Sequence, residues 1–166
     1  MAKNFSPTAE THHMPASPRC TICSNSANVY RRKSDDVFEG FCEVCGDVSI
    51  RASAADKARN LGKAHLLSAW LRRHPPLPEP ETIKVDDLER IFSQVPSYSV
   101  VEKLDLTLQR LGAATEQPGA VAKFSAIKDY PLIYAKNVEE AMFYLRALDE
   151  SGYISQETET SSRIKA

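Results

Sequence analysis

Four cysteines in two pairs are the residues of this sequence that point most directly to chemistry. The pairs are Cys20-Thr-Ile-Cys23 and Cys42-Glu-Val-Cys45, with 18 residues between them. Each Cys-x-x-Cys turn brings two thiolates to one side of the chain, and two turns complete the tetrahedral shell of sulfurs that Zn²⁺ favours. Four protein ligands leave no open position for a substrate. We therefore expect one Zn²⁺ with a structural role, bound by Cys20, Cys23, Cys42 and Cys45.

Other uses of paired cysteines stay open. A Cys-x-x-Cys pair can be a redox dithiol, although that motif usually begins a helix in a βαβ unit, and no such unit is visible here. Four thiolates can also hold an iron–sulfur cluster. Two disulfides would need an oxidising compartment. The first residues lack the apolar segment of a secretion signal, so we expect a cytoplasmic protein with reduced or metal-bound thiols.

The residues around the cysteines have the pattern of short strands. Residues 28–32 and 37–42 indicate a hairpin with its turn at 33–36, and residues 47–51 indicate a third strand. Gly46 follows the second pair, where a positive φ is often needed. Two cysteine turns around a hairpin resemble the zinc-ribbon family over residues 18–51. The resemblance implies a small sheet that is stabilised by its metal.

Six basic residues favour an alternative function, nucleic-acid binding. They are Arg31, Arg32, Lys33, Arg59, Lys63 and Arg73. The first three lie at the predicted hairpin tip, and the others lie near Trp70 on one side of a helix predicted over residues 54–73, where they could contact phosphates and bases. The tip also carries Asp35 and Asp36, and basic side chains on a helix often only cover apolar surface.

The chain divides into two parts of opposite charge. Residues 19–73 carry ten Lys/Arg and six Asp/Glu, a net of +4, whereas residues 74–150 carry eight and thirteen, a net of −5. A proline-rich run between them is typical of a stiff linker, and a rigid loop within one domain is the alternative. The expected segments are a flexible tail (1–18), a zinc ribbon with a long helix (19–74), a linker (75–81) and a second domain (82–166).

The second part has the periodicity of helices. Apolar residues recur every three to four positions, and caps are expected at Ser97 and Asn137 and a helix stop at Gly112. The expected elements are helices at 86–95, 97–112 and 137–150, a weak strand at 121–127, an extended segment at 129–134, and a hairpin of residues 153–157 and 162–166.

Residues 137–154 resemble the third helix and the wing of winged-helix domains. With the zinc ribbon, this resemblance implies an α+β chain: a small β zinc ribbon followed by a mainly α, winged-helix-like domain. In DNA-binding members of that family the third helix usually enters the major groove. Its exposed residues here would be Glu139, Glu140, Phe143, Arg146 and Asp149 or Glu150. This face is acidic and opposes phosphate binding, so we expect protein contacts instead.

No enzyme motif accompanies these features. The sequence has no glycine-rich phosphate loop, no His-Glu-x-x-His and no Gly-x-Ser-x-Gly, and no apolar run approaches the roughly 20 residues of a membrane helix. We expect a non-enzymatic zinc-binding recognition or regulatory module that acts through protein contacts. A loose similarity to N-terminal regions of bacterial defence-associated proteins implies a protein partner or a C-terminal effector domain, and a chain that is the N-terminal part of a longer protein.

Overall fold

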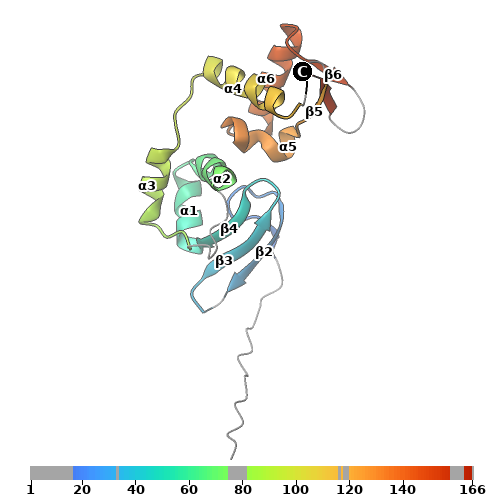
Figure 1. Ribbon diagram of the computed structural model, residues 1–166. Helices are drawn as coiled ribbons and strands as arrows, with labels where there is room; N and C mark the ends of the chain where they lie inside the picture. Colours follow the sequence, from blue (N-terminus) through green and yellow to red (C-terminus); the bar gives the residue numbers. More distant parts are fainter. Residues whose placement is uncertain are drawn as a thin grey trace, which may run out of the picture.

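The computed structural model describes residues 17–32, 34–74, 82–115, 117, 120–157 and 163–165. Helix and antiparallel sheet are combined in these residues, which confirms the predicted α+β class (Figure 1). The strands are β1 (Ser17–Arg19), β2 (Ser26–Arg32), β3 (Val37–Cys42), β4 (Gly46–Arg51), β5 (Val121–Lys123), β6 (Ser155–Glu157) and β7 (Arg163–Lys165). The helices are α1 (Ala52–Asn60), α2 (Ala64–Arg73), α3 (Asp87–Gln94), α4 (Val100–Ala113), α5 (Ala126–Asp129), the 3-10 helix η1 (Tyr130–Ile133) and α6 (Val138–Glu150).

The first sheet has the order β1-β2-β3-β4 and is antiparallel throughout. Its hairpin and third strand confirm the strands predicted from the sequence. Gly40 in β3 has a φ of +141°, and a Cβ there would lie 2.1 Å from the carbonyl oxygen of Asn28, so only glycine fits. Beyond the proline-rich run, Ile83 forms a parallel bridge with Ile50 and covers part of the outer edge of β4.

The end predicted for an N-terminal tail, residue 18, already lies in the first sheet. The backbone of Ser17 lies opposite Val29, and Arg19 lies opposite Ser26, so the chain already belongs to the sheet at residue 17. The prediction of a tail up to residue 18 is therefore wrong at its end, because pairing with β2 satisfies the backbone groups of these residues. Residues 1–16 lie outside the described part of the chain.

The single helix predicted over residues 54–73 is wrong, because the chain forms two helices there. Gly62 has a φ of +67°, a conformation that ends α1 and that side chains rarely adopt. The amide of Lys63 donates to the carbonyl oxygen of Ala58 at 2.9 Å, and this hydrogen bond closes the turn between α1 and α2. The break lets α2 change direction and lie between the first sheet and η1, both of which it contacts (Figure 1).

In the second part of the chain, the predicted positions of the helices agree with the structure, but two of the predicted helix ends do not. α3 and α6 confirm the periodicity, and the side chain of Asn137 caps α6 by accepting from the amide of Glu140 at 2.9 Å. The predicted cap Ser97 is wrong: Ser99 caps α4 in a capping box with Glu102. The predicted stop at Gly112 is also wrong, since α4 continues to Ala113.

Residues 121–134 differ most from expectation. Only β5 is strand, and the segment predicted as extended around Pro131 is the helix η1, in whose first turn proline needs no donor. Asp129 supports the short helix α5 that precedes η1, since its Oδ2 accepts from the amide of Ser125 at 2.9 Å. The last two strands confirm the predicted hairpin, whose connecting residues lie outside the described ones, and they pair with β5 in the order β5-β7-β6.

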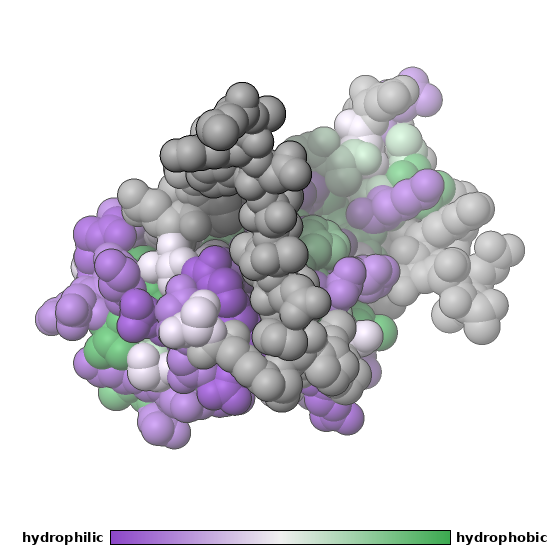
Figure 2. Space-filling view, turned by 90° about the horizontal axis from the view of Figure 1, so that it is seen from below, coloured by the Kyte–Doolittle hydropathy of each residue, from purple (hydrophilic) through white to green (hydrophobic). Residues whose placement is uncertain are grey.

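One buried cluster runs through both parts of the chain. It extends from Cys20 and Ile50 in the first sheet, through Leu67 of α2, to Tyr144 and Ile154 in the second part. At the end of the molecule formed by the first sheet, hydrophilic residues cover most of the described surface (Figure 2). Among the described residues, no helix has the length and apolar character needed to cross a membrane. The division into domains at residues 75–81 stays a prediction, since that run is outside the described residues.

Candidate metal centre

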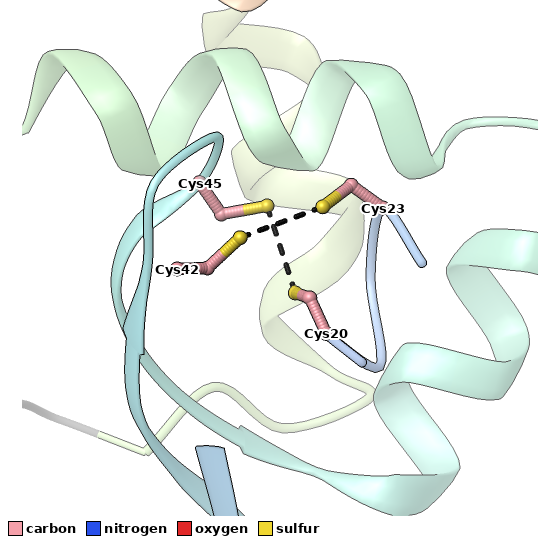
Figure 3. Close-up of side chains that lie close together, drawn as sticks. All are labelled: Cys20, Cys23, Cys42 and Cys45. Atoms are coloured by element: carbon pink, nitrogen blue, oxygen red, sulfur yellow. Dashed lines mark hydrogen bonds between the residues drawn. The ribbon is translucent and has the colours of Figure 1, made fainter. Parts of the chain in front are cut away.

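The two cysteine pairs lie in two turns at the same end of the first sheet. Cys20 and Cys23 belong to the turn between β1 and β2, and Cys42 and Cys45 belong to the turn between β3 and β4. Because β2 and β3 are antiparallel, the start of one strand lies beside the end of the other, with Ala27 opposite Cys42. The four side chains therefore converge, with their sulfurs pointing toward one another (Figure 3).

Backbone hydrogen bonds fix the shape of both turns. In the first, the amide of Ser24 donates to the carbonyl oxygen of Cys20 at 2.9 Å, and the amide of Ile22 points at the Sγ of Cys20 at 3.4 Å. In the second, Gly46 has a φ of +82°, which confirms the positive φ predicted there. These turns place each pair of sulfurs on one side of the chain.

The sulfur geometry fits a tetrahedral metal. The Sγ atoms of Cys20 and Cys45 are 3.8 Å apart, those of Cys23 and Cys42 are 3.5 Å apart, and all four lie within 4.8 Å of one another. Zn–S bonds of about 2.3 Å set the edges of a regular tetrahedron at about 3.8 Å. A disulfide needs about 2.05 Å, so none of the pairs is bonded. The four cysteines can thus hold one metal ion such as zinc.

The close thiols of the cluster shift one another's pKa values in opposite directions. Hydrogen bonds with Cys20 and Cys23 lower the pKa of Cys42, and a hydrogen bond with Cys20 lowers the pKa of Cys23 to about 7. Hydrogen bonds with neighbouring thiols raise the pKa of Cys20 and of Cys45. The lowered pKa values favour the thiolate form at Cys23 and Cys42, and a metal bound by all four cysteines would have to displace protons from Cys20 and Cys45.

Ser68 of α2 belongs to the centre although it lies far from both pairs in the sequence. Its side chain is completely buried, and its Oγ lies 3.2 Å from the Sγ of Cys45. The same Oγ lies 3.2 Å from the carbonyl oxygen of Ala64, so the one hydroxyl proton has two acceptors. Ser68 is not among the residues that the sequence pattern predicts for the site. One feature of the sequence could have indicated it: Ser68 lies one turn from Ala64 and from Leu71, on the predicted apolar face of the helix. A hydroxyl that is buried on such a face needs a hydrogen-bond partner.

Two contacts join the centre to the second part of the chain. Glu43, inside the second cysteine turn, forms an ion pair of 2.9 Å with Lys128 of α5. Tyr130 of η1 is buried in the same cluster as Cys20, Cys42 and Cys45, and burial, together with the nearby thiols, raises its pKa. The centre thus lies against α2, α5 and η1, and not in an isolated hairpin.

The basic residues at the hairpin tip are engaged with neighbouring acids. The Nε of Arg31 donates to Asp36 at 2.6 Å. Arg32 forms two hydrogen bonds to Asp35, at 2.8 and 2.6 Å, and an ion pair with Glu39 at 3.0 Å. Lys33 lies outside the described residues. The acids cancel much of the positive field that a phosphate would meet.

The other three basic residues lie in three different surroundings. Arg59 forms an ion pair with Asp56, and the ammonium group of Lys63 lies 5.1 Å from the ring centre of Phe92. Arg73 donates to the carbonyl oxygen of Leu132 at 2.9 Å and lies over the ring of Tyr134. The break at Gly62 removes the single helix on which Arg59, Lys63 and Arg73 were expected to share a face. That shared face is therefore a wrong prediction.

The exposed face of α6 is acidic, as predicted, but one of the residues predicted to lie on it does not. Glu139, Arg146, Asp149 and Glu150 are exposed, and 55% of Phe143 is accessible to solvent. Glu140 is not part of this face. Its carboxylate accepts from the ammonium group of Lys103 at 2.8 Å and from the hydroxyl of Tyr144, because the helix turns this side chain toward α4.

Comparisons with protein-family models, with curated proteins and with solved structures found no match to this chain. The residues and their geometry are therefore the features that point to a function. These give four cysteines that can hold a metal ion, a buried serine beside them, and contacts that join the centre to both parts of the chain.

Proposed function

We propose that this chain is a non-enzymatic zinc-stabilised recognition module that acts through protein contacts. The observation that carries the proposal is the closed set of four sulfurs. Zn²⁺ bound by all four has no open position at which water or a substrate could be activated. The metal would then act on stability alone, as expected for a small sheet with two cysteine turns.

Two family resemblances remain part of this proposal. Turns at one end of a short antiparallel sheet support a zinc ribbon in residues 18–51. For the second part, α6 followed by the hairpin β6-β7 supports a winged-helix-like domain, and β5 completes its sheet. The long segment before α6 also suits this arrangement better than the sequence suggested, since it contains a strand and two short helices.

Protein contacts are favoured over nucleic acid by the charges. Glu139, Phe143, Arg146 and Glu150 follow one face of α6 at helical spacing. The exposed ring of Phe143 lies between Glu139 and Arg146, and Glu150 follows one turn after Arg146, so the face carries two carboxylates and one cation. Such a face suits a partner with apolar and basic groups and repels a phosphate backbone. The alternative, nucleic-acid binding by the basic zinc ribbon and first helix, is weakened because Arg31, Arg32 and Arg59 are paired with acids.

The metal part of the proposal is tested by elemental analysis and by cobalt substitution. We expect about one zinc per purified chain. Co²⁺ in place of zinc should give the intense absorption of tetrahedral cobalt thiolate, which reports the ligand set in the unmodified sequence. Metal-free folded protein, or a cobalt spectrum without thiolate bands, would contradict the proposal.

The protein-contact part is tested by capture experiments in nuclease-treated extract with three baits. The unmodified chain and Leu61→Asp, which changes an exposed apolar residue on the other part, should retain the same protein. Phe143→Asp should lose it. A partner that all three baits retain equally would place the contact elsewhere. A gel shift that weakens with salt and vanishes on reversing the charges of Arg59 and Lys63 would instead support the alternative.

A further inference from the structure

A pocket of about 360 Å³ lies where α2 meets the second part of the chain. Its charged lining residues are Arg72 of α2, Arg110 of α4, Lys123 of β5 and Asp129 of α5. Phe124 and Leu132 supply apolar lining. The volume is at the small end of the range of small-molecule sites, about 300–1,000 Å³.

The lining has an excess of positive charge. Three cations face one carboxylate, and that carboxylate is already engaged: its Oδ1 accepts from Arg72 at 3.1 Å and its Oδ2 accepts from the amide of Ser125. Neither Arg110 nor Lys123 forms an ion pair with another of the described residues. A concave site with two unpaired cations attracts anions more strongly than a flat surface does.

Arg72 has hydrogen-bonding capacity that the fold does not use. Its Nη2 donates to Asp129, but its buried Nε has no hydrogen-bond partner among the described residues. An unpaired buried donor is unfavourable, and the Arg72 side chain as a whole is about one quarter exposed, so a ligand oxygen that reaches it would satisfy this donor. A planar guanidinium with free donors matches the geometry of a phosphate.

We propose that this pocket binds the phosphate group of a small phosphomonoester. The lining carries a net charge of about +2, which complements a phosphate monoester of about −1.5 to −2 at neutral pH. Phe124 and Leu132 would contact its organic part. The site goes beyond the recognition function proposed above, and it does not involve the metal centre.

The larger pocket between α1 and α3 does not share this character. It has about 670 Å³ and contains Lys57 and Lys63, but Asp86 and Glu89 balance them. The ammonium group of Lys63 is also occupied by the ring of Phe92. The charges of its lining are therefore balanced and do not favour an anion.

Isothermal titration calorimetry at constant ionic strength tests the proposal with two probes, inorganic phosphate and phenyl phosphate. We expect saturable binding with a dissociation constant of about 0.1–1 mM for phenyl phosphate and weaker binding for inorganic phosphate. Arg110→Gln and Lys123→Gln should each weaken binding about tenfold, because each removes one charged contact to the phosphate. Both side chains are exposed, so these variants should fold and keep their zinc.

Arg146→Gln on α6 is the matched control, since it removes an exposed arginine that does not line the pocket. Its affinity should stay within about twofold of the unmodified chain. Absence of saturable binding at about 10 mM of either probe, or equal weakening in Arg146→Gln, would overturn the proposal. Equal affinity for both probes would contradict the proposed contact of Phe124 and Leu132 with the organic group. The ligand would then be inorganic phosphate and not a phosphomonoester.

Discussion

The hydroxyl of Ser68 is predicted to strengthen metal binding, and Ser68→Ala tests this. The single proton of this hydroxyl can be donated either to Cys45 or to the carbonyl oxygen of Ala64, both 3.2 Å away. A thiolate on a metal is the stronger acceptor, so metal binding should draw the proton to the sulfur. Without a metal, the carbonyl oxygen of Ala64 is the neutral acceptor that this hydroxyl can use.

The expected loss of zinc affinity in Ser68→Ala follows from this change of the hydroxyl's acceptor. A hydrogen bond to a charged group contributes about 1.5–3 kcal/mol and a neutral one about 0.5–1.5 kcal/mol. The exchange therefore contributes about 1–2 kcal/mol to the metal-bound state, which corresponds to about a 5- to 30-fold loss of zinc affinity in Ser68→Ala. This agrees with the effect of about 10- to 100-fold that is usual for residues that support metal ligands.

Competition with a chromophoric zinc chelator at one fixed pH measures the effect. Ser93→Ala is the matched control, because Ser93 also donates from a helix to a backbone carbonyl, that of Arg90 at 2.7 Å, but is exposed and lies on α3. Equal affinities of the two variants would refute the role of Ser68.

Three other positions have expected outcomes. Gly40→Ala should lower the free energy of unfolding by about 2–5 kcal/mol in urea titrations, because the φ and the Asn28 carbonyl both exclude a Cβ, whereas a cost below about 1 kcal/mol would contradict this. Burial on its own raises the pKa of Glu140, but hydrogen bonds from Lys103 and Tyr144 lower it below 4.5. The unfolded state therefore binds more protons below pH 4.5, and the loss of stability on acidification there should be smaller in Glu140→Gln. Burial and the charge of Lys136 lower the pKa of His65 below 6.5, so stability should fall as the pH drops from 6.5, and thermal melts of His65→Gln should lack this step; an unchanged pH profile would contradict it.

The sequence was most informative where local spacing determines the outcome. The positions of the cysteines set two turns, and the alternation after each turn set the strands, so the convergence of four sulfurs followed from adjacent antiparallel pairing. The cap at Asn137 could be predicted for the same reason, because its side chain accepts from the amide of Glu140, only three residues along the chain.

The sequence was least informative where distant contacts decide. Pro131 suggested an extended segment, but it lies in the first turn of η1, where the packing of Tyr130 and Ile133 in the core favours a helical turn. The periodicity of residues 54–73 indicated one helix, although Gly62 and the packing of α2 against η1 divide it. The contact between Ser68 and Cys45 joins residues 23 positions apart on different elements, so no local pattern could specify it.

Hydrogen exchange before and after metal removal tests the central claim most directly, namely that a four-sulfur metal centre stabilises both parts of the chain. The contacts of the centre with Ser68, Tyr130 and Lys128 predict that chelation exposes the amides of β2 and β3 and also those of α2 and η1. Protection that is lost only in residues 20–51, or that is unchanged by chelation, would contradict the claim.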